Sequence, residues 1–368
     1  MPRKNYSRIK KKDDGIAVID AVNDYLESQH VQNLSLRTQE EYRDELQTFA
    51  SWCQSHQIRN EKGKREAIKG DGVLIHQVGA HAVRLFLDDF QATHKPSKKG
   101  QSEISTYTLA GYVRVIKSFL TWCLHDDQYG VDIKVIQQIE KPRVVEKIVE
   151  TFSPDQIGAL FKACEKEEND HLQLRDRAIL AVLLDCGLRA EELITLIIGN
   201  VHVDPGDSYL KVFGKGSKWR EVGMGIDTRK YVQKYIRVYR EPTIEYAVKQ
   251  QYKNLSERQQ KQKSKEITQE LCVFVGRTGD NLTTNGLFQI IRRLGEWAHI
   301  EGVRCSPHTF RHTFSRMFME NDGNIYTLSK LLGHTSVGTT ETYLKSLQKS
   351  SARKGAKSVL DNIDHLQK

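Results

Sequence analysis

Three side chains suited to binding anions or moving protons lie at helical spacing in the stretch SPHTFRHTF. Ser306 can cap a helix and Pro307 suits its first position, so a helix is predicted to begin here with outward-pointing N–H groups. His308, Arg311 and His312 then share one face, at spacings of three and four residues. A metal would accept the histidines but not the guanidinium beside them, whereas a phosphate would accept all three and the helix terminus.

A zinc site is the alternative to a phosphate cradle at this helix. The helix of a zinc protease reads H-E-x-x-H, and Thr309 stands where that motif requires glutamate. We therefore predict a phosphate site and no bound metal or cofactor. His312 has two interpretations, a site residue or a hydrogen-bonded core histidine, and we favour the core position.

Four further candidates lie in other fragments of the second half: Arg189 in GLRAEEL, Lys215 in GKGSKWR, and His334 and Tyr343 in LLGHTSVGTTETYLK. Cutting a phosphodiester without a metal needs a nucleophile, cations on the non-bridging oxygens and an acid for the leaving oxygen. The candidate set contains residue types for each of these tasks.

The elements that must position these residues are predicted to be helices and a small sheet. Ser153 and Pro154 signal a helix start, and a helix precedes GLRAEEL. Residues 209–213 and 219–222 read as strands, flanked by turns at 204–206 and 214–216, which gives a small antiparallel sheet with Lys215 at its tip. The stretch 241–270 is poor in large apolar residues and is expected to be an exposed helical or mobile insertion.

The first half reads as helices from about residue 16 to residue 139, because apolar positions recur at helical spacing. Thr38, Tyr42, Phe49, Trp52 and Cys53 are matched 70 residues later by Thr108, Tyr112, Phe119, Trp122 and Cys123. We interpret this repeated stripe as the core of a helix bundle rather than as a base-stacking surface. The polar stretches 59–72 and 93–106 read as surface loops that are either phosphate contacts or simply solvated.

Bulk composition favours a polyanionic partner. The 368 residues contain 56 Lys and Arg against 47 Asp and Glu, a formal charge of +9 with a pI near 9.1, which makes nucleic acid the leading candidate. The six cysteines form no C-x-x-C pair, and several lie in apolar helical stretches, which suggests reduced thiols. Without an apolar run of about 20 residues or a signal-peptide core, the chain is expected to be cytoplasmic.

Read in order, GLRAEEL, GKGSKWR, PHTFRHTF and LLGHTSVGTTETYLK resemble the tyrosine recombinase (phage integrase) family. The resemblance covers nearly the whole chain and implies a mainly α fold with a small antiparallel β-sheet. The domains it implies are a basic flexible arm at 1–15, a helical core-binding (DNA-binding) domain at 16–140, a linker at 141–150, a catalytic domain at 151–345 and a C-terminal tail at 346–368.

The resemblance also implies a role for each candidate in a metal-free and ATP-independent reaction. Tyr343 would be the nucleophile, leaving a 3′-phosphotyrosyl link, while Arg189 and Arg311 would stabilise charge on phosphorus. His308 would accept the proton of Tyr343, His334 would donate to a phosphate oxygen, and Lys215 would protonate the leaving 5′-oxygen. Glu192 would hold the site together through hydrogen bonds to its residues, without contacting the phosphate. Lys218 is the alternative acid.

The expected partners are double-stranded DNA with specific recombination sites, further copies of the chain in a tetramer, and an accessory directionality or host DNA-bending protein. Cys186 and Lys345 depart from the usual residues of the family without touching its core chemistry. A type IB topoisomerase, a telomere resolvase and a non-catalytic DNA-binding protein are the alternative functions. The amphipathic end of the tail, from Val359 to Leu366, is hypothesised to dock on a neighbouring protomer, the alternative being a solvated end.

Overall fold

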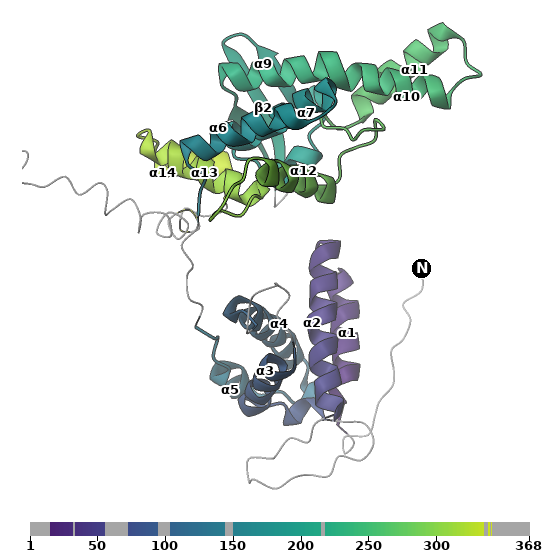
Figure 1. Cartoon of the computed structure of the whole chain (residues 1–368). Helices are drawn as coiled ribbons and strands as arrows, with labels where there is room; N and C mark the ends of the chain where they lie inside the picture. The colour runs from purple at the N-terminus through teal and green to yellow at the C-terminus, as the bar shows by residue number, and fades with distance from the viewer. Residues whose placement is uncertain are drawn as a thin grey trace, which may run out of the picture. The chain divides into compact units, whose positions relative to one another are not determined.

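The computed structural model describes residues 15–31, 34–55, 73–94, 104–143, 150–214, 218–334, 338 and 340. The chain divides into two compact units, Met1–Glu146 and Lys147–Lys368, each with its own hydrophobic core (Figure 1). The described residues are predominantly helical with one small antiparallel sheet, as the sequence predicted.

The N-terminal unit packs its helices around aromatic side chains. Its elements are α1 (Val18–Val31), α2 (Leu36–Ser55), η1 (Ile75–Gln77), α3 (Ala80–Thr93), α4 (Thr106–Leu124), η2 (Asp127–Tyr129) and α5 (Ile133–Gln138). The repeated stripe lies on α2 and α4, where Phe49, Cys53, Phe119 and Cys123 are fully buried in one core. The interpretation of these positions as core is therefore confirmed.

The threonines that open the stripe have a different role. Ser35 Oγ accepts a hydrogen bond from the Thr38 N–H at 3.2 Å, and Ser105 Oγ accepts the equivalent bond from Thr108 at 3.2 Å. Neither threonine is buried, so the core positions of the stripe begin after them. Both lie in the first turn of a helix, where hydroxyl groups satisfy N–H groups that have no partner within the helix.

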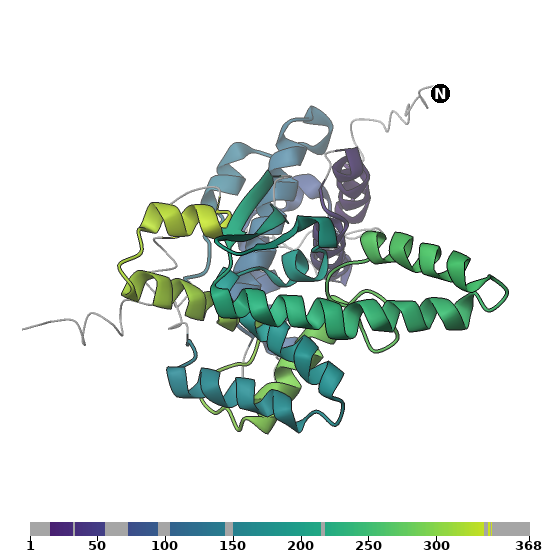
Figure 2. The ribbon, with the colours of Figure 1, turned by 90° about the horizontal axis from the view of Figure 1, so that it is seen from above.

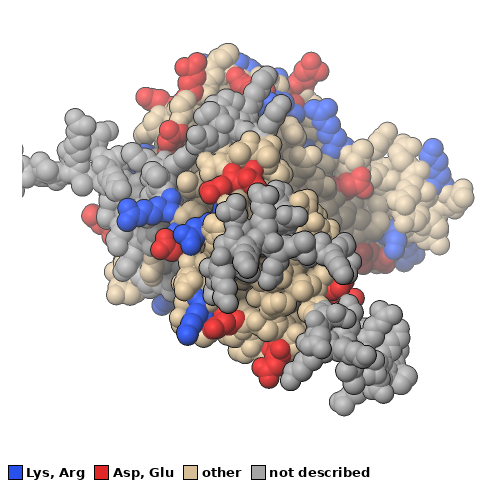
Figure 3. All heavy atoms as spheres, turned by 90° about the horizontal axis from the view of Figure 1, so that it is seen from below, with Lys and Arg blue, Asp and Glu red and all other residues tan. Residues whose placement is uncertain are grey.

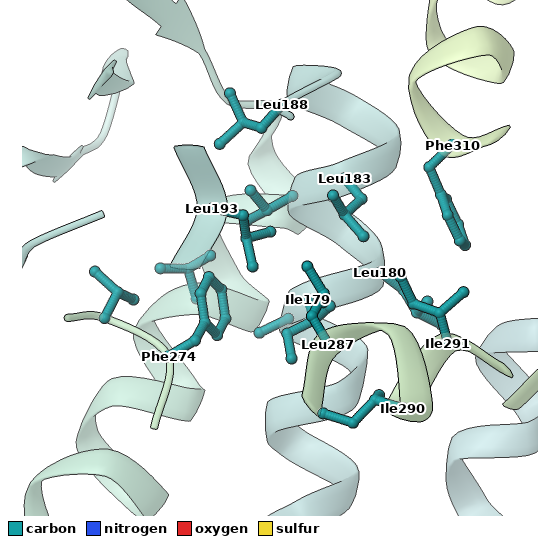
Figure 4. Close-up of a cluster of buried hydrophobic side chains, with 14 of the residues drawn as sticks. Ile179, Leu180, Leu183, Leu188, Leu193, Phe274, Leu287, Ile290, Ile291 and Phe310 are labelled. Atoms are coloured by element: carbon teal, nitrogen blue, oxygen red, sulfur yellow. The ribbon is translucent and has the colours of Figure 1, made fainter. Parts of the chain in front are cut away.

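The C-terminal unit is built around α7 (Asp170–Cys186), which is buried on most of its sides. The other elements are α6 (Pro154–Ala163), η3 (Cys164–Lys166), α8 (Ala190–Ile194), η4 (Ile198–Asn200), β1 (Val201–Asp204), β2 (Asp207–Gly214), β3 (Lys218–Gly223), α9 (Ile226–Tyr235), η5 (Ile236–Arg240), α10 (Glu241–Gln251), α11 (Glu257–Glu270), α12 (Thr284–Trp297), α13 (Pro307–Glu320) and α14 (Ile325–Leu332). Figure 4 shows Ile179, Leu180 and Leu183 of α7 among side chains from α8, α12 and α13. This core fixes the position of the C-terminal end of α7, and the segment with Gly187 and Arg189 follows directly after it.

The sheet is antiparallel in the order β1-β2-β3, with Val212 opposite Arg220 and Phe213 opposite Trp219. Strand alternation gives it two unlike faces. Val212 is buried and Arg220 is mostly buried on the inner face, whereas the rings of Phe213 and Trp219 are about half exposed on the outer face. The predicted turn at 204–206 joins β1 to β2, and the predicted tip at Lys215 lies outside the described residues.

The stretch 241–270 is helical, and α10 and α11 lie side by side as a projecting hairpin (Figure 2). The fully buried side chain of Arg240 holds the end of α11 in place where this hairpin joins the rest of the unit. Arg240 Nη2 donates to the carbonyls of Thr268 and Leu271 at 2.8 and 2.7 Å, and Nε donates to Cys272 at 3.0 Å. A cation at the last carbonyls of α11 is favourably placed, because these groups have no partner within the helix.

Surface charge is mixed on the face that Figure 3 shows, where Lys and Arg side chains of the described residues are interspersed with Asp and Glu. On that face the Lys and Arg side chains of the described residues form no single basic patch. Of the described helices, none combines the length and the apolar character needed to cross a membrane. All six cysteines are free, and burial raises the pKa of Cys53, Cys123 and Cys164 to about 12.

Candidate active site

The helix predicted at SPHTFRHTF is present as α13. Ser306 Oγ accepts the Thr309 N–H at 3.3 Å and Pro307 occupies the first turn, as the sequence indicated. His308 is exposed and Arg311 is buried, one turn further along the helix. His312 is partly buried, and its interpretation as a core histidine stays a prediction. Burial, followed by the charges of His308 and Arg311, lowers its pKa to about 4.

Backbone carbonyls from two distant segments hold the guanidinium of Arg311. Nη1 donates to Gly187 O at 2.8 Å and Nη2 donates to Leu332 O. Nη2 also lies 3.3 Å from Nε2 of His334, whose Nδ1 is 2.8 Å from Thr340 Oγ1. Arg311 and His334, which are 23 residues apart in sequence, therefore belong to one cluster.

Gly187 makes the first of these contacts possible. It ends α7 with φ +58°, in the left-handed region that favours glycine. An added Cβ would lie 2.3 Å from Cδ1 of Phe314, so the ring of a neighbouring helix also excludes a side chain here. The glycine of the GLR fragment thus turns the chain toward Arg189 and directs its own carbonyl at Arg311.

Glu192 lies beneath the arginines and organises them. Its carboxylate is 4% exposed and accepts the Arg189 N–H at 2.9 Å and Arg189 Nη1 at 2.8 Å. Arg220 Nη1 and Nη2 donate to the two carboxylate oxygens at 2.8 and 2.7 Å, a bidentate pair. Arg311 Nη1 is 4.0 Å from the same carboxylate. Three guanidinium groups therefore surround one carboxylate.

This cluster has an excess of positive charge, three arginines against one glutamate, or +2. Burial alone would raise the pKa of Glu192, but the hydrogen bonds and charge of Arg220, followed by Arg189, outweigh it and lower that pKa to about 2. The carboxylate is ionised throughout the physiological range. An excess of fixed cations with little solvent around them suits an anion such as a phosphate diester.

The histidines of the site are neutral at physiological pH. Desolvation and the charges of Arg311, Arg189 and Arg304 lower the pKa of His308, and desolvation with Arg311, Arg189 and Arg220 lowers that of His334 to about 4. A neutral imidazole can accept a proton, which an imidazolium cannot. In the part of the chain that the structure describes, no three His, Cys, Asp or Glu side chains gather as ligands for a metal.

Of the predicted residues, the structure brings together Arg189, Glu192, His308, Arg311 and His334. Lys215 and Tyr343 lie outside the described residues, as do residues 1–14 of the predicted arm and the tail 346–368. Lys218, the alternative acid, is an exposed residue that pairs with Gly214 at the end of the hairpin.

Arg220 belongs to this cluster and was missed in the sequence. A signal for it was present, because Arg220 precedes the apolar Val222 by two positions in a predicted strand and so shares its inward face. An arginine on the inner face of a strand requires a buried partner. The partner, Glu192, is 28 residues away, and nothing in the local pattern identifies it.

Comparisons with known proteins identify the family of the chain and agree with its fold. The sequence profile of the phage integrase family matches residues 150–350. A tyrosine recombinase XerD of Oceanobacillus iheyensis is 30% identical over 239 residues, 65% of this chain and 71% of the relative. The XerD of Pseudomonas aeruginosa is 28% identical over 310 residues, 84% of this chain and 87% of the relative.

Among solved structures, the XerH site-specific recombinase bound to a palindromic difH substrate, a post-cleavage complex, superposes with a TM-score of 0.61. The two chains are 15% identical, and the match covers 94% of this chain and 90% of that one. At this identity the likeness bears on the fold alone.

Proposed function

The chain belongs to the phage integrase family and is a tyrosine site-specific recombinase, and we propose that it cuts and rejoins DNA through a covalent 3′-phosphotyrosyl link to Tyr343. The observation that carries this proposal is the cluster of Arg189, Arg311 and Arg220 around the buried carboxylate of Glu192, beside two neutral histidines. Such a cluster offers positive charge and a proton acceptor without a metal.

The proposed reaction begins with attack by the Tyr343 hydroxyl on the scissile phosphorus. A phenol of pKa about 10 is mostly protonated at neutral pH, so His308 takes its proton. Arg189 and Arg311 stabilise the charge that builds on the non-bridging oxygens, and His334 donates a hydrogen bond to one of them. The bond from phosphorus to the 5′-oxygen breaks, and Lys215 supplies the proton that this oxygen needs.

The products of this step are a 3′-phosphotyrosine and a free 5′-hydroxyl, and the energy of the phosphodiester is kept in the new ester. The 5′-hydroxyl of a second strand then attacks the phosphotyrosine, Tyr343 leaves and a phosphodiester forms again. No ATP is consumed, because one bond replaces another of the same kind. The catalytic domain is proposed to span 151–345, with Lys215 and Tyr343 completing the cluster that the described residues form.

The remaining parts of the proposal concern partners and biological role. The helical unit from 16 to 140 is proposed to grip the DNA core site, with basic residues of 59–72 and 93–106 on phosphates. Exchange between two sites, each cut on both strands, requires four copies of the chain, hence a tetramer on DNA. We propose integration or excision of a mobile element as the role, helped by a directionality or DNA-bending protein.

A nicked substrate tests the chemistry. The nick lies close to the cleavage position, so that the short 5′-hydroxyl fragment diffuses away and the covalent adduct accumulates. We expect wild type to form an adduct that survives denaturant in excess EDTA, and Tyr343→Phe to bind the site without forming one. An adduct with Tyr343→Phe would place the nucleophile elsewhere. Loss of wild-type cleavage in EDTA, with rescue by a divalent ion, would refute the metal-free scheme.

The same assay separates the alternative functions. Joined products from two separate sites identify a recombinase. Relaxation of supercoiled DNA with an adduct but without joined products would identify a topoisomerase-like enzyme. Tight binding with no adduct on any substrate would identify a DNA-binding protein without this activity.

A further inference from the structure

We propose that Arg220 is a positioning residue for recombination, which keeps Glu192 and the segments that carry Arg189 and His334 in the arrangement needed for cleavage. This inference rests on the proposed function of the cluster. It assigns a role to a residue that neither touches the phosphate nor supplies a proton.

The hydrogen bonds of Arg220 join its own strand, β3, to two other segments that are far apart in the sequence. Its two Nη atoms bind Glu192, whose oxygens hold the N–H and Nη1 of Arg189. Its Nε donates to Leu331 O at 2.7 Å, in the last turn of α14 and three residues before His334. One planar guanidinium therefore fixes the relative positions of all three.

Two glycines allow the backbone to approach this guanidinium closely. An added Cβ at Gly214 would lie 3.0 Å from Arg220 Nη1 and 3.3 Å from Glu192 Oε1. An added Cβ at Gly333, which has φ +63°, would lie 3.1 Å from the same Nη1. Gly214 ends β2, and Gly333 precedes His334. Both segments are thus packed against Arg220, whose side chain is 12% exposed.

Charge explains why an arginine is needed at this position. A carboxylate can accept a bidentate fork, and the fork of Arg220 occupies both oxygens of Glu192. The guanidinium of Arg189 then contacts one oxygen, through Nη1 only, and this side chain is more exposed than that of Arg220, 27% against 12%. Without Arg220, the buried carboxylate would draw Arg189 and Arg311 inward, away from the position of the phosphate.

The test compares Arg220→Gln, Arg220→Lys, Glu192→Gln and the double variant Arg220→Gln/Glu192→Gln. We expect Arg220→Gln to lower single-turnover cleavage at saturating DNA roughly tenfold to a hundredfold, because a small displacement of positioned groups has effects of that order. Site affinity should change little. Arg220→Lys should recover part of the rate, since one ammonium replaces one of the two parallel bonds. Equal rates for Arg220→Gln and wild type would overturn the proposal.

A pH profile separates positioning from a general loss of structure. The charged groups that face Glu192 are Arg189 at the N-cap of its helix, Arg220 on β3 and Arg311 on α13, and the titratable ring of His334 faces it as well. Removing Arg220 raises the pKa of the carboxyl, so its protonated form accumulates at higher pH and releases Arg189. The acid limb of the cleavage rate should therefore move to higher pH in Arg220→Gln and return when Glu192→Gln is added. Parallel profiles in all variants would overturn the proposal.

Arg293→Gln is the matched control, because it also removes an arginine from buried carboxylates, those of Glu167 and Asp176, which belong to no part of the site. It should lower stability without moving the pH profile. Hydrogen exchange at the Arg189 amide, which binds Glu192, adds a measurement that needs no cleavage. It should accelerate in Arg220→Gln and not in Arg293→Gln. If wild type forms no adduct, the proposed function fails, and the exchange rates still decide the role of Arg220.

Discussion

Substitution of Gly187 by alanine tests how the fold positions Arg311. Gly187 has φ +58°, and its carbonyl accepts Arg311 Nη1 at 2.8 Å. An L-residue in this conformation costs about 1–2 kcal/mol. The added methyl would also lie 2.3 Å from Cδ1 and 2.9 Å from Cε1 of Phe314, and such overpacking costs about 1–3 kcal/mol. We expect Gly187→Ala to destabilise the C-terminal unit by about 2–5 kcal/mol in all.

Gly302→Ala is the matched control for the conformational part. Gly302 has φ +75°, yet an added Cβ would meet nothing within 4 Å. Its substitution should therefore cost only the left-handed term of about 1–2 kcal/mol. It should also leave cleavage unchanged, since its carbonyl has no part in the site. The difference between the two variants isolates the steric overlap with Phe314.

The assay is urea unfolding combined with single-turnover adduct formation on a nicked site. If the Gly187 peptide tilts to relieve the overlap with Phe314, Arg311 moves with the carbonyl that binds it. A displacement of about 1 Å can lower the rate of adduct formation on the order of a hundredfold. In a Phe314→Ala background the cost of Gly187→Ala should fall to that of Gly302→Ala, a double-mutant coupling of about 1–3 kcal/mol. An undiminished cost in that background would refute the reasoning.

Three further outcomes are expected. Lys215→Ala should cut ordinary DNA slowly but cut a bridging 5′-sulfur substrate nearly as fast as wild type, because a thiolate leaves without a proton. Arg189→Ala should stay slow on both substrates. If Lys215→Ala is equally slow on both, Lys218 becomes the next acid to examine. His312 and His334 have pKa values of about 4 in the folded chain against about 6.5 in the unfolded chain. Between these pH values the unfolded chain binds more protons, so the free energy of unfolding measured in urea should decline from pH 6.5 toward pH 4. A flat profile over this range would contradict the neutral histidines. Deleting residues from Ser350 onward should spare single-site cleavage but abolish recombination if the tail docks on a neighbouring protomer, and unchanged recombination would remove that hypothesis.

The sequence by itself determined the features that depend on local periodicity and local chemistry. The 3.6-residue period of a helix placed His308, Arg311 and His312 on the same face of consecutive turns. Ser306 and Pro307 marked where this helix begins. The turns at 204–206 and 214–216, with the short stretches beside them, predicted the sheet, and the 70-residue repeat predicted that Phe49 and Phe119 are buried. The helix and turn signals are readable because each arises from residues within a few positions of one another, and the repeat is readable because two helices carry the same local pattern.

Tertiary structure decided which distant groups complete the site. The carbonyls of Gly187 and Leu332 that hold Arg311 are 124 and 21 residues from it in sequence, and Arg220 is 28 residues from Glu192. Every residue has a backbone carbonyl, so the sequence cannot show which carbonyls bind Arg311. An arginine on the inner face of a strand indicates that a buried partner exists but does not identify that partner. The burial of His312 likewise depends on which elements pack over α13. Contacts of this kind arise only when the cores around α7 and the sheet bring those segments together.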